Sequence, residues 1–137
     1  MTADQPAAPR RIQRRRIKGW RKPAGAVIVD RTSIYGNPFR IVGLCVDSPD
    51  GRTWSCGSLA AAQRHATEQY RAWLEGSGPD VYGAASRTYD RRRILAGLPV
   101  LRGRDLACPC PEPAPGVPDW CHGAVLLGLV SGREVDQ

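Results

Sequence analysis

The feature that most constrains this fold is a proline-rich loop that joins two apolar segments and carries cysteines at both ends. Leu106–Cys108 reads as a short buried strand, and Cys121–Val130 reads as an apolar helix. The intervening PCPEPAPGVPDW holds too much proline and glycine for a strand or a helix, so it is predicted to be a loop. This one connection brings the end of a strand close to the start of a helix.

Residues that bind metals or perform thiol chemistry are concentrated at the two ends of this loop. The candidate metal ligands are Cys108, Cys110, Cys121 and His122. Zinc and iron–sulfur sites use three or four ligands of these types, so we expect a metal, with zinc first and an iron–sulfur cluster as the alternative. His122 is a fourth ligand or, outside the coordination shell, a catalytic acid or base. Metal-free reactive thiols and inert packing remain open.

Length and composition indicate one domain. The chain has 137 residues, enough for a single core. It contains no run of about 20 apolar residues, so we expect no membrane span. The N-terminal segment lacks the apolar centre of a signal peptide, which predicts a cytoplasmic protein with reduced cysteines. Cys45 and Cys56 are predicted to have no role beyond packing.

The formal net charge of +7 lies entirely at the N-terminus. Residues 1–22 contain eight Lys and Arg residues and one acid, and the rest of the chain is neutral. This segment is predicted to be a basic, partly disordered arm with a helical turn in Arg10–Lys22, and an arm of this kind can neutralise nucleic-acid phosphates. The cations predicted to contact nucleic acid are Arg14, Arg15, Arg16, Lys18 and Arg21. A solvated tail, or a positive rim that attracts a small anionic substrate, is the alternative.

Ala26–Val29 is the first predicted strand, and apolar residues on both of its faces favour a central, parallel position. In open α/β sheets, ligands bind in the loops beyond the carboxyl ends of the strands. Here that loop is Asp30–Phe39, in which Asp30 is a candidate catalytic base. The candidate ligand-binding residues are Arg31, Thr32 and Asn37. A rigid Gly-Asn-Pro turn with Phe39 as a core anchor is the alternative interpretation.

Two further helices and a hairpin are predicted in the middle of the chain. The turn Ser-Pro-Asp-Gly between Arg40–Val46 and Arg52–Trp54 indicates a hairpin. Ser58 is a predicted N-cap for a helix over 59–75, and Ser86–Gly97 is predicted to be a second amphipathic helix.

Taken in order, these elements predict a small single α/β domain over residues 23–131. Its sheet is expected to be short, mainly parallel and flanked by helices, and a helix at Gly123–Val130 is expected to precede a polar tail at 132–137. The Asp30–Phe39 loop and the cysteines then lie at the same edge of the sheet and form one pocket.

Several common functions have no motif in this chain. The GxGxxG and Walker sequences are absent, and so are the H-x-E and P-C-x-x-C elements of zinc deaminases. We therefore expect a metal-binding protein whose Cys/His pocket acts on or binds a nucleotide, a nucleoside or a nucleic-acid base. One alternative is a non-enzymatic nucleic-acid-binding accessory protein that uses the basic arm, with the cysteines as a structural clip. The other is a thiol redox protein.

Four stretches of the chain resemble a known family. They are KGWRKP at Lys18–Pro23, DRTSIYGNPF at Asp30–Phe39, YRAWL at Tyr70–Leu74, and LRGRDLACPC with the later Cys-His pair. Together they are similar to the domain-of-unknown-function family 4326, small proteins of phages and actinobacteria, over about residues 14–130. This chain departs from the family at Tyr35, where members usually carry Trp, and in Cys-Pro-Cys, where they usually show Cys-Trp-Cys. The resemblance implies a phage-related protein and carries no assigned activity.

Overall fold

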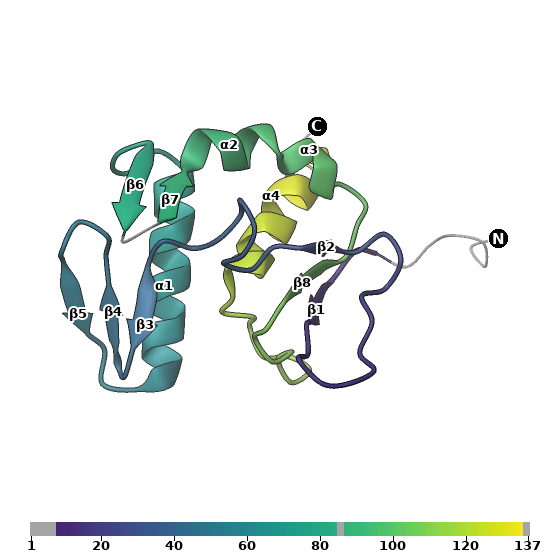
Figure 1. Cartoon of the computed structure of the whole chain (residues 1–137), viewed down its shortest axis with the longest axis horizontal. Coiled ribbons are helices and arrows are strands. Elements are labelled where there is room, and N and C mark those ends of the chain that lie inside the picture. The colour runs from purple at the N-terminus through teal and green to yellow at the C-terminus, as the bar shows by residue number, and fades with distance from the viewer. Residues whose placement is uncertain (1–7, 85–86, 136–137) are drawn as a thin grey trace.

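The computed structural model describes residues 8–84 and 87–135, and it has a mixed α/β fold (Figure 1). The elements in chain order are β1 (Arg11–Gln13), β2 (Val27–Ile28), β3 (Arg40–Val42), β4 (Cys45–Asp47), β5 (Thr53–Ser55), α1 (Leu59–Leu74), β6 (Val81–Ala84), β7 (Arg87–Asp90), α2 (Arg91–Ala96), α3 (Leu98–Leu101), β8 (Leu106–Cys108) and α4 (His122–Val135). A three-stranded parallel sheet packs against helices beside two small antiparallel sheets, which confirms the predicted fold class. No helix within the described ranges is long and apolar enough to cross a membrane.

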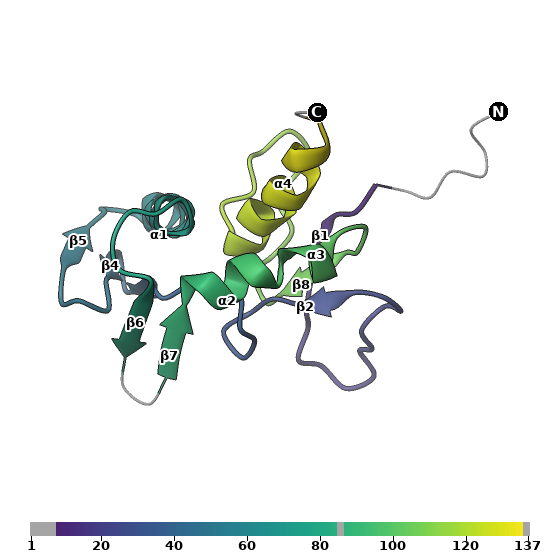
Figure 2. The same cartoon turned by 90° about the horizontal axis from the view of Figure 1, so that it is seen from above.

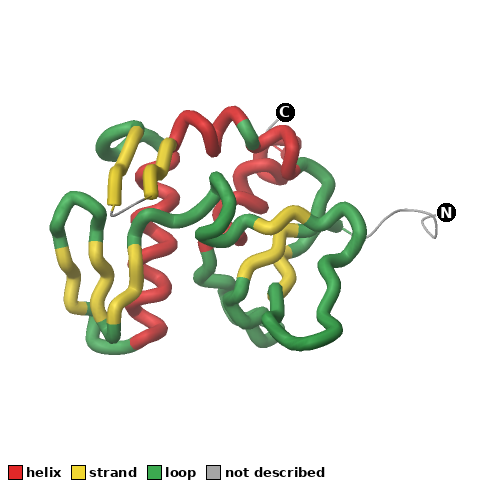
Figure 3. Tube along the Cα trace, in the orientation of Figure 1, coloured by secondary structure: helices red, strands yellow, loops and turns green. Residues whose placement is uncertain are grey.

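The parallel sheet has the strand order β1-β8-β2, with long loops around it (Figure 3). The predicted strand at Leu106–Cys108 is confirmed, and its three side chains are completely buried. It pairs with both neighbours, so that Ile12 and Ile28 both align with Ala107. The central position predicted for β2 is therefore wrong. The fully apolar β8 occupies the centre, because it alone has neighbours along both edges, and β2 is an edge strand with half-buried side chains.

The first strand replaces the helical turn predicted within Arg10–Lys22. Arg11–Gln13 is extended and parallel to β8, and the main-chain nitrogen of Arg14 continues the ladder by donating to the Cys108 carbonyl at 2.7 Å. The pairing with β8 determines this conformation, because the backbone groups along that edge of β8 need hydrogen-bond partners. Local helix propensity carries no information about this distant strand. The predicted disorder of residues 1–9 falls mostly on residues that the structure does not describe.

The predicted hairpin across Ser-Pro-Asp-Gly is confirmed as β4 and β5. The segment predicted as a single strand, Arg40–Val46, is two strands, because Gly43 adopts a φ of +61° and turns the chain back. The result is a three-stranded antiparallel meander with the order β3-β4-β5.

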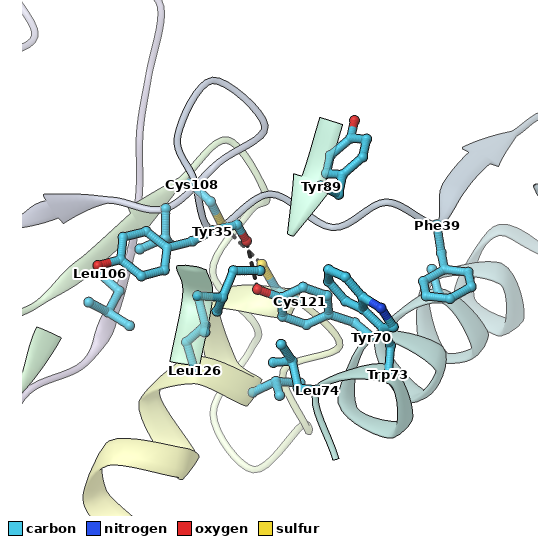
Figure 4. Packing of buried hydrophobic residues seen from close by; sticks show 14 of the residues in the cluster. Tyr35, Phe39, Tyr70, Trp73, Leu74, Tyr89, Leu106, Cys108, Cys121 and Leu126 are labelled. Atoms are coloured by element: carbon cyan, nitrogen blue, oxygen red, sulfur yellow. Dashed lines mark hydrogen bonds between the residues drawn. The ribbon is translucent and has the colours of Figure 1, made fainter. Parts of the chain in front are cut away.

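The predicted long helix is confirmed as α1, and the Ser58 side chain caps it by accepting a hydrogen bond from the Ala61 nitrogen. One face of α1 packs on the meander and the other on α4, and Figure 2 shows the two helices side by side. Its buried residues include Tyr70 and Trp73, which are completely inaccessible and form the centre of the core (Figure 4).

The second predicted helix is shorter than expected. Arg87–Asp90 is strand β7, paired with β6, and only Arg91–Ala96 is helical, while Ser86 lies outside the described residues. The helix begins there because the extended Asp90 caps it, accepting from the Arg92 nitrogen. At the other end of the chain, α4 continues to Val135, past the Val130 that the sequence indicated.

Candidate functional site

The three cysteines of the proline-rich loop meet at the carboxyl end of β8. Cys108 ends that strand, Cys110 follows two residues later, and Cys121 immediately precedes α4. Their Sγ atoms all lie within 4.8 Å of one another, and those of Cys108 and Cys121 are 3.0 Å apart. Cys108 and Cys121 are buried and Cys110 is half-buried. This geometry could hold a metal ion, and Figure 4 shows Cys108 and Cys121 next to Tyr70 in the core.

The loop between the cysteines is fixed by Arg11 of β1. Its buried guanidinium forms an ion pair with Asp119 and donates to the carbonyl of Cys110 at 2.8 Å and to that of Pro111 at 2.6 Å. The same group donates to the Cys108 Sγ at 3.3 Å. Burial alone would lower the pKa of Arg11, but the bond to Asp119 and the nearby sulfurs raise it, so the cation is firmly held. Sequence reasoning counted Arg11 only as part of the basic arm.

Contacts among the three sulfurs favour ionisation of Cys110 and disfavour ionisation of Cys108 and Cys121. Hydrogen bonds from Cys108 and Cys121 lower the pKa of Cys110 to about 3. The bond that Cys108 gives to Cys110 raises its own pKa, and the bonds that Cys121 gives to both partners raise its pKa as well. The group therefore holds one thiolate readily at neutral pH, and a cation placed among the sulfurs is needed before all three are ionised.

His122 opens α4 but is not a member of the three-sulfur group. Its Nε2 lies 2.5 Å from the Val29 carbonyl, and its ring packs in a T-shaped arrangement with Tyr70, with centroids 5.4 Å apart. Burial lowers the pKa of His122, which favours a neutral imidazole that donates from Nε2. A metal or catalytic role for His122 stays a prediction.

Asp30 follows β2 and organises the start of the loop beyond that strand. Its carboxylate accepts from the Thr32 hydroxyl, from the Thr32 nitrogen at 2.9 Å and from Arg14 at 2.6 Å. Burial alone would raise the pKa of Asp30, but the bonds from Thr32 and Arg14 outweigh it and lower the pKa below its usual value. A strongly acidic, paired carboxylate is suited to orienting its neighbours, and the role of catalytic base stays a prediction.

Asn37 ties the same loop to α1. Its Nδ2 donates to the Ala66 carbonyl at 3.1 Å, and its Oδ1 accepts from the Phe39 nitrogen at 2.9 Å. Gly36, just before it, is required by space, since a Cβ there would lie 3.0 Å from the Arg31 Cα. The Gly-Asn-Pro segment is thus the rigid turn that the sequence offered as one interpretation. Both polar groups of the Asn37 amide already have partners.

A cavity of about 440 Å³ joins this loop to the cysteines. Its lining residues are Arg16, Asp30, Arg31, Thr32, Asn37, Phe39, Ile41, Gln63, Ala66, Thr67, Pro109, Cys110, Trp120, Cys121 and His122. The structure thus brings the predicted loop residues and two of the predicted cysteine ligands to one pocket. Gln63 and Trp120 were missed, because a polar residue on a helix and a tryptophan in a loop have no sequence signal of their own. Trp120 is placed by Arg64 of α1, whose guanidinium lies 5.1 Å from its ring centroid.

The predicted nucleic-acid contacts do not form one free surface. The half-buried Arg14 is paired with the buried Asp30. The side chains of Arg15, Arg16, Lys18 and Arg21 are exposed. Of these four, Arg16 lines the cavity, so the arm and the pocket are adjacent at this residue.

Comparison with known proteins identifies the family of this chain. The model of the family described as Domain of unknown function (DUF4326) matches residues 12–132. No curated protein and no solved structure matches the chain. The match begins in β1 and ends within α4, so it includes the cysteines, the loop after β2 and Arg31.

Proposed function

This chain belongs to the DUF4326 family, and from its site we propose that it holds one zinc ion on Cys108, Cys110 and Cys121 and binds a nucleotide, nucleoside or nucleobase in the adjoining cavity. The observation that carries the proposal is that three sulfurs within 4.8 Å of one another include two, on Cys110 and Cys121, whose residues line a cavity of small-molecule size.

The donor set favours zinc. Three thiolates within bonding reach of one point suit a soft or borderline cation, and zinc accepts them in a tetrahedral arrangement that leaves a fourth position. A zinc ion with three thiolates has a net charge of −1, and the Arg11 guanidinium, which also pairs with Asp119, places positive charge beside it by donating to Cys108. When bound, the ion would act as a Lewis acid at the wall of the cavity.

The cavity lining favours a planar, polar ligand. Phe39 and Trp120 supply aromatic surface, and Gln63 supplies an amide that makes no side-chain hydrogen bond within the described part of the chain. The free amide of Gln63 can form hydrogen bonds with the edge of a base or with an amide of the ligand. Asn37 is not available for this role, because both of its polar groups already have partners. In this proposal Thr32 and Arg31 contact the ligand, Asn37 shapes the loop, and Asp30 and His122 are the candidate proton-transfer residues.

Metal analysis of protein purified without air tests the first half of the proposal. We expect one zinc per chain, lost in the variants Cys108→Ser, Cys110→Ser and Cys121→Ser and kept in the matched controls Cys45→Ser and Cys56→Ser. A brown protein with acid-labile sulfide would show that the cysteines bind an iron–sulfur cluster in place of zinc. A wild-type protein that takes up no metal from added zinc would contradict the proposal. A Cys108–Cys121 disulfide in such a sample would favour the thiol redox alternative.

Titration calorimetry with nucleosides and nucleotides tests the second half. Gln63→Leu removes the free amide from the cavity, while Gln69→Leu makes the same change on the same helix outside this cavity. We expect only the first substitution to weaken binding, by about tenfold for one lost hydrogen-bonding group. Equal affinities of the two variants would contradict the assignment of Gln63 to the ligand.

A second candidate, nucleic-acid binding by the N-terminal segment, is favoured by the exposure of four cations between Arg15 and Arg21. Deleting the whole arm would remove β1, so the suitable variant replaces Arg15, Lys18 and Arg21 with Gln and leaves Arg11 and Arg14 in place. This candidate predicts salt-dependent binding to DNA or RNA that the triple variant loses. Unchanged binding in the variant would contradict it.

A further inference from the structure

Arg31 differs from the other sheltered arginines of the described chain in having no carboxylate partner. Arg11 pairs with Asp119, Arg14 with Asp30 and Arg91 with Asp80. Among residues 8–84 and 87–135, the half-buried Arg31 makes one long hydrogen bond, 3.4 Å to the Phe39 carbonyl. A sheltered cation without a counter-charge is costly, and proteins keep such a group where a ligand supplies the missing charge.

The surroundings of Arg31 make the missing charge more evident. Burial lowers the pKa of Arg31 most. Among the groups nearby, Tyr89 and Cys110 raise this pKa while the cations Arg40 and Arg87 lower it, and the pKa stays below its usual value. Both neighbouring cations are exposed, and none of the three has an ion pair within the described residues. This part of the molecule is therefore prepared for an anion.

The position of Arg31 connects this site to the proposed ligand. Arg31 lines the cavity that Cys110 and Cys121 also line, and the exposed Arg16 borders the same space. A guanidinium presents paired N–H donors that match the oxygens of a phosphoryl group, which makes a phosphate a better partner than a neutral polar group.

We propose that Arg31, assisted by Arg16, binds the phosphoryl group of a nucleoside monophosphate whose base occupies the cavity. The inference rests on the proposed nucleotide-like ligand and is independent of the metal. It selects the nucleotide from the three ligand types that the proposed function leaves open, and it excludes the free nucleoside and the free base as the preferred ligands.

The test compares the four ribonucleoside 5′-monophosphates with their nucleosides and with inorganic phosphate by titration calorimetry on the full chain. We expect at least one monophosphate to bind about tenfold or more tightly than its own nucleoside, and Arg31→Gln to abolish that preference. Arg31→Lys keeps the charge without the paired donors and should retain part of the preference. The control Arg71→Gln removes an exposed cation of α1 that does not line the cavity, and it should keep the wild-type preference.

Thermal unfolding and zinc content are measured on the same samples. Because Arg31 has no carboxylate partner, Arg31→Gln should unfold at the wild-type temperature or higher, and a clear fall in its Tm would assign Arg31 to the fold and overturn the inference. Nucleosides binding as tightly as monophosphates would overturn it while leaving the proposed function intact. Failure of every probe to bind would overturn both. If a protein without zinc binds a monophosphate in a way that depends on Arg31, the result would support the inference and contradict only the proposed zinc site.

Discussion

The guanidinium of Arg11 lies 3.3 Å from the Sγ of Cys108, and through it the first strand is tied to the cysteine group. The same side chain holds two carbonyls of the proline-rich loop and the carboxylate of Asp119. The first turn of α4 packs against it as well, since a Cβ at Gly123 would lie 3.1 Å from the Arg11 Cδ. One buried cation therefore sets the spacing between the strand, the loop and the helix that carry the cysteines.

Replacing Arg11 with Met should damage stability and metal binding together. The change leaves Asp119 and two loop carbonyls without their donor, and we expect a loss of about 3 kcal/mol in the free energy of unfolding. Zinc affinity should fall about tenfold or more, because the orientation of Cys110 depends on the loop. Urea unfolding and a competitive zinc chelator measure the two effects, with the exposed Arg10→Met as the control. Wild-type zinc affinity in Arg11→Met would show that the loop holds its shape without the cation.

Asp30→Asn should change the dependence of stability on pH. The pKa of Asp30 is lower in the folded protein than in the unfolded chain, so its contribution is complete above the unfolded pKa of about 4 and is lost as the pH falls through the folded pKa. At pH 7 the variant should be less stable by about 2 kcal/mol, and the difference should shrink below about pH 4. The exposed Asp50→Asn serves as a control with a smaller effect. A difference that stays constant from pH 7 to pH 3 would refute the pairing.

Gly97→Ala should be destabilising for steric reasons, and Tyr35→Phe should partly relieve it. A Cβ at Gly97 would lie 2.8 Å from the Tyr35 hydroxyl oxygen, which itself donates to the Gly97 carbonyl at 2.8 Å. We expect a cost of about 1–3 kcal/mol for Gly97→Ala. Removing the hydroxyl frees the space, so the double variant should lose less stability than the sum of the two single variants. Strict additivity in chemical unfolding would mean that the two groups do not meet.

Ser58→Ala should weaken α1 at its first turn. The Ser58 hydroxyl accepts a hydrogen bond from the Ala61 nitrogen at 3.1 Å, and loss of an N-cap of this type costs about 1 kcal/mol. Ser58→Asp keeps an accepting oxygen at the same place and should retain most of the stability. Equal losses in both variants, measured by urea unfolding, would argue against a capping role.

The local patterns predicted those parts of the fold that depend on neighbours in sequence. The helix after Ser58 and the hairpin across Ser-Pro-Asp-Gly are each fixed by a cap or a turn within a few residues. The buried strand ending at Cys108 was predicted from its own apolar residues, although the strands that it pairs with are distant in the chain. The strand at Arg11–Gln13 was missed because its partner, β8, is about 95 residues away and its buried cation reads as part of a charged arm. Strand β7 was missed although its partner β6 is the preceding strand, because Ser86–Gly97 has a helical pattern that the pairing of Tyr89 with Tyr82 outweighs.

The candidate site was predictable to the extent that its chemistry is concentrated in the sequence. Cysteines at the two ends of one loop must meet if that loop is closed, and they do. The sequence does not show what closes it, because Arg11 acts from a distant strand. The sequence also does not show that the Asn37 amide donates a hydrogen bond to α1 whereas Gln63 lines the cavity. That difference depends on how α1 packs against the loop.

X-ray absorption at the zinc edge of the purified protein tests the central claim most directly. The account predicts three sulfur scatterers at about 2.3 Å and one nitrogen or oxygen scatterer that changes when a ligand enters the cavity. Its second prediction is that Cys110→Ser lowers the sulfur count, while Cys56→Ser leaves it unchanged. A zinc ion bound by four light atoms, or by sulfurs that survive the loss of Cys110, would contradict a site built from Cys108, Cys110 and Cys121.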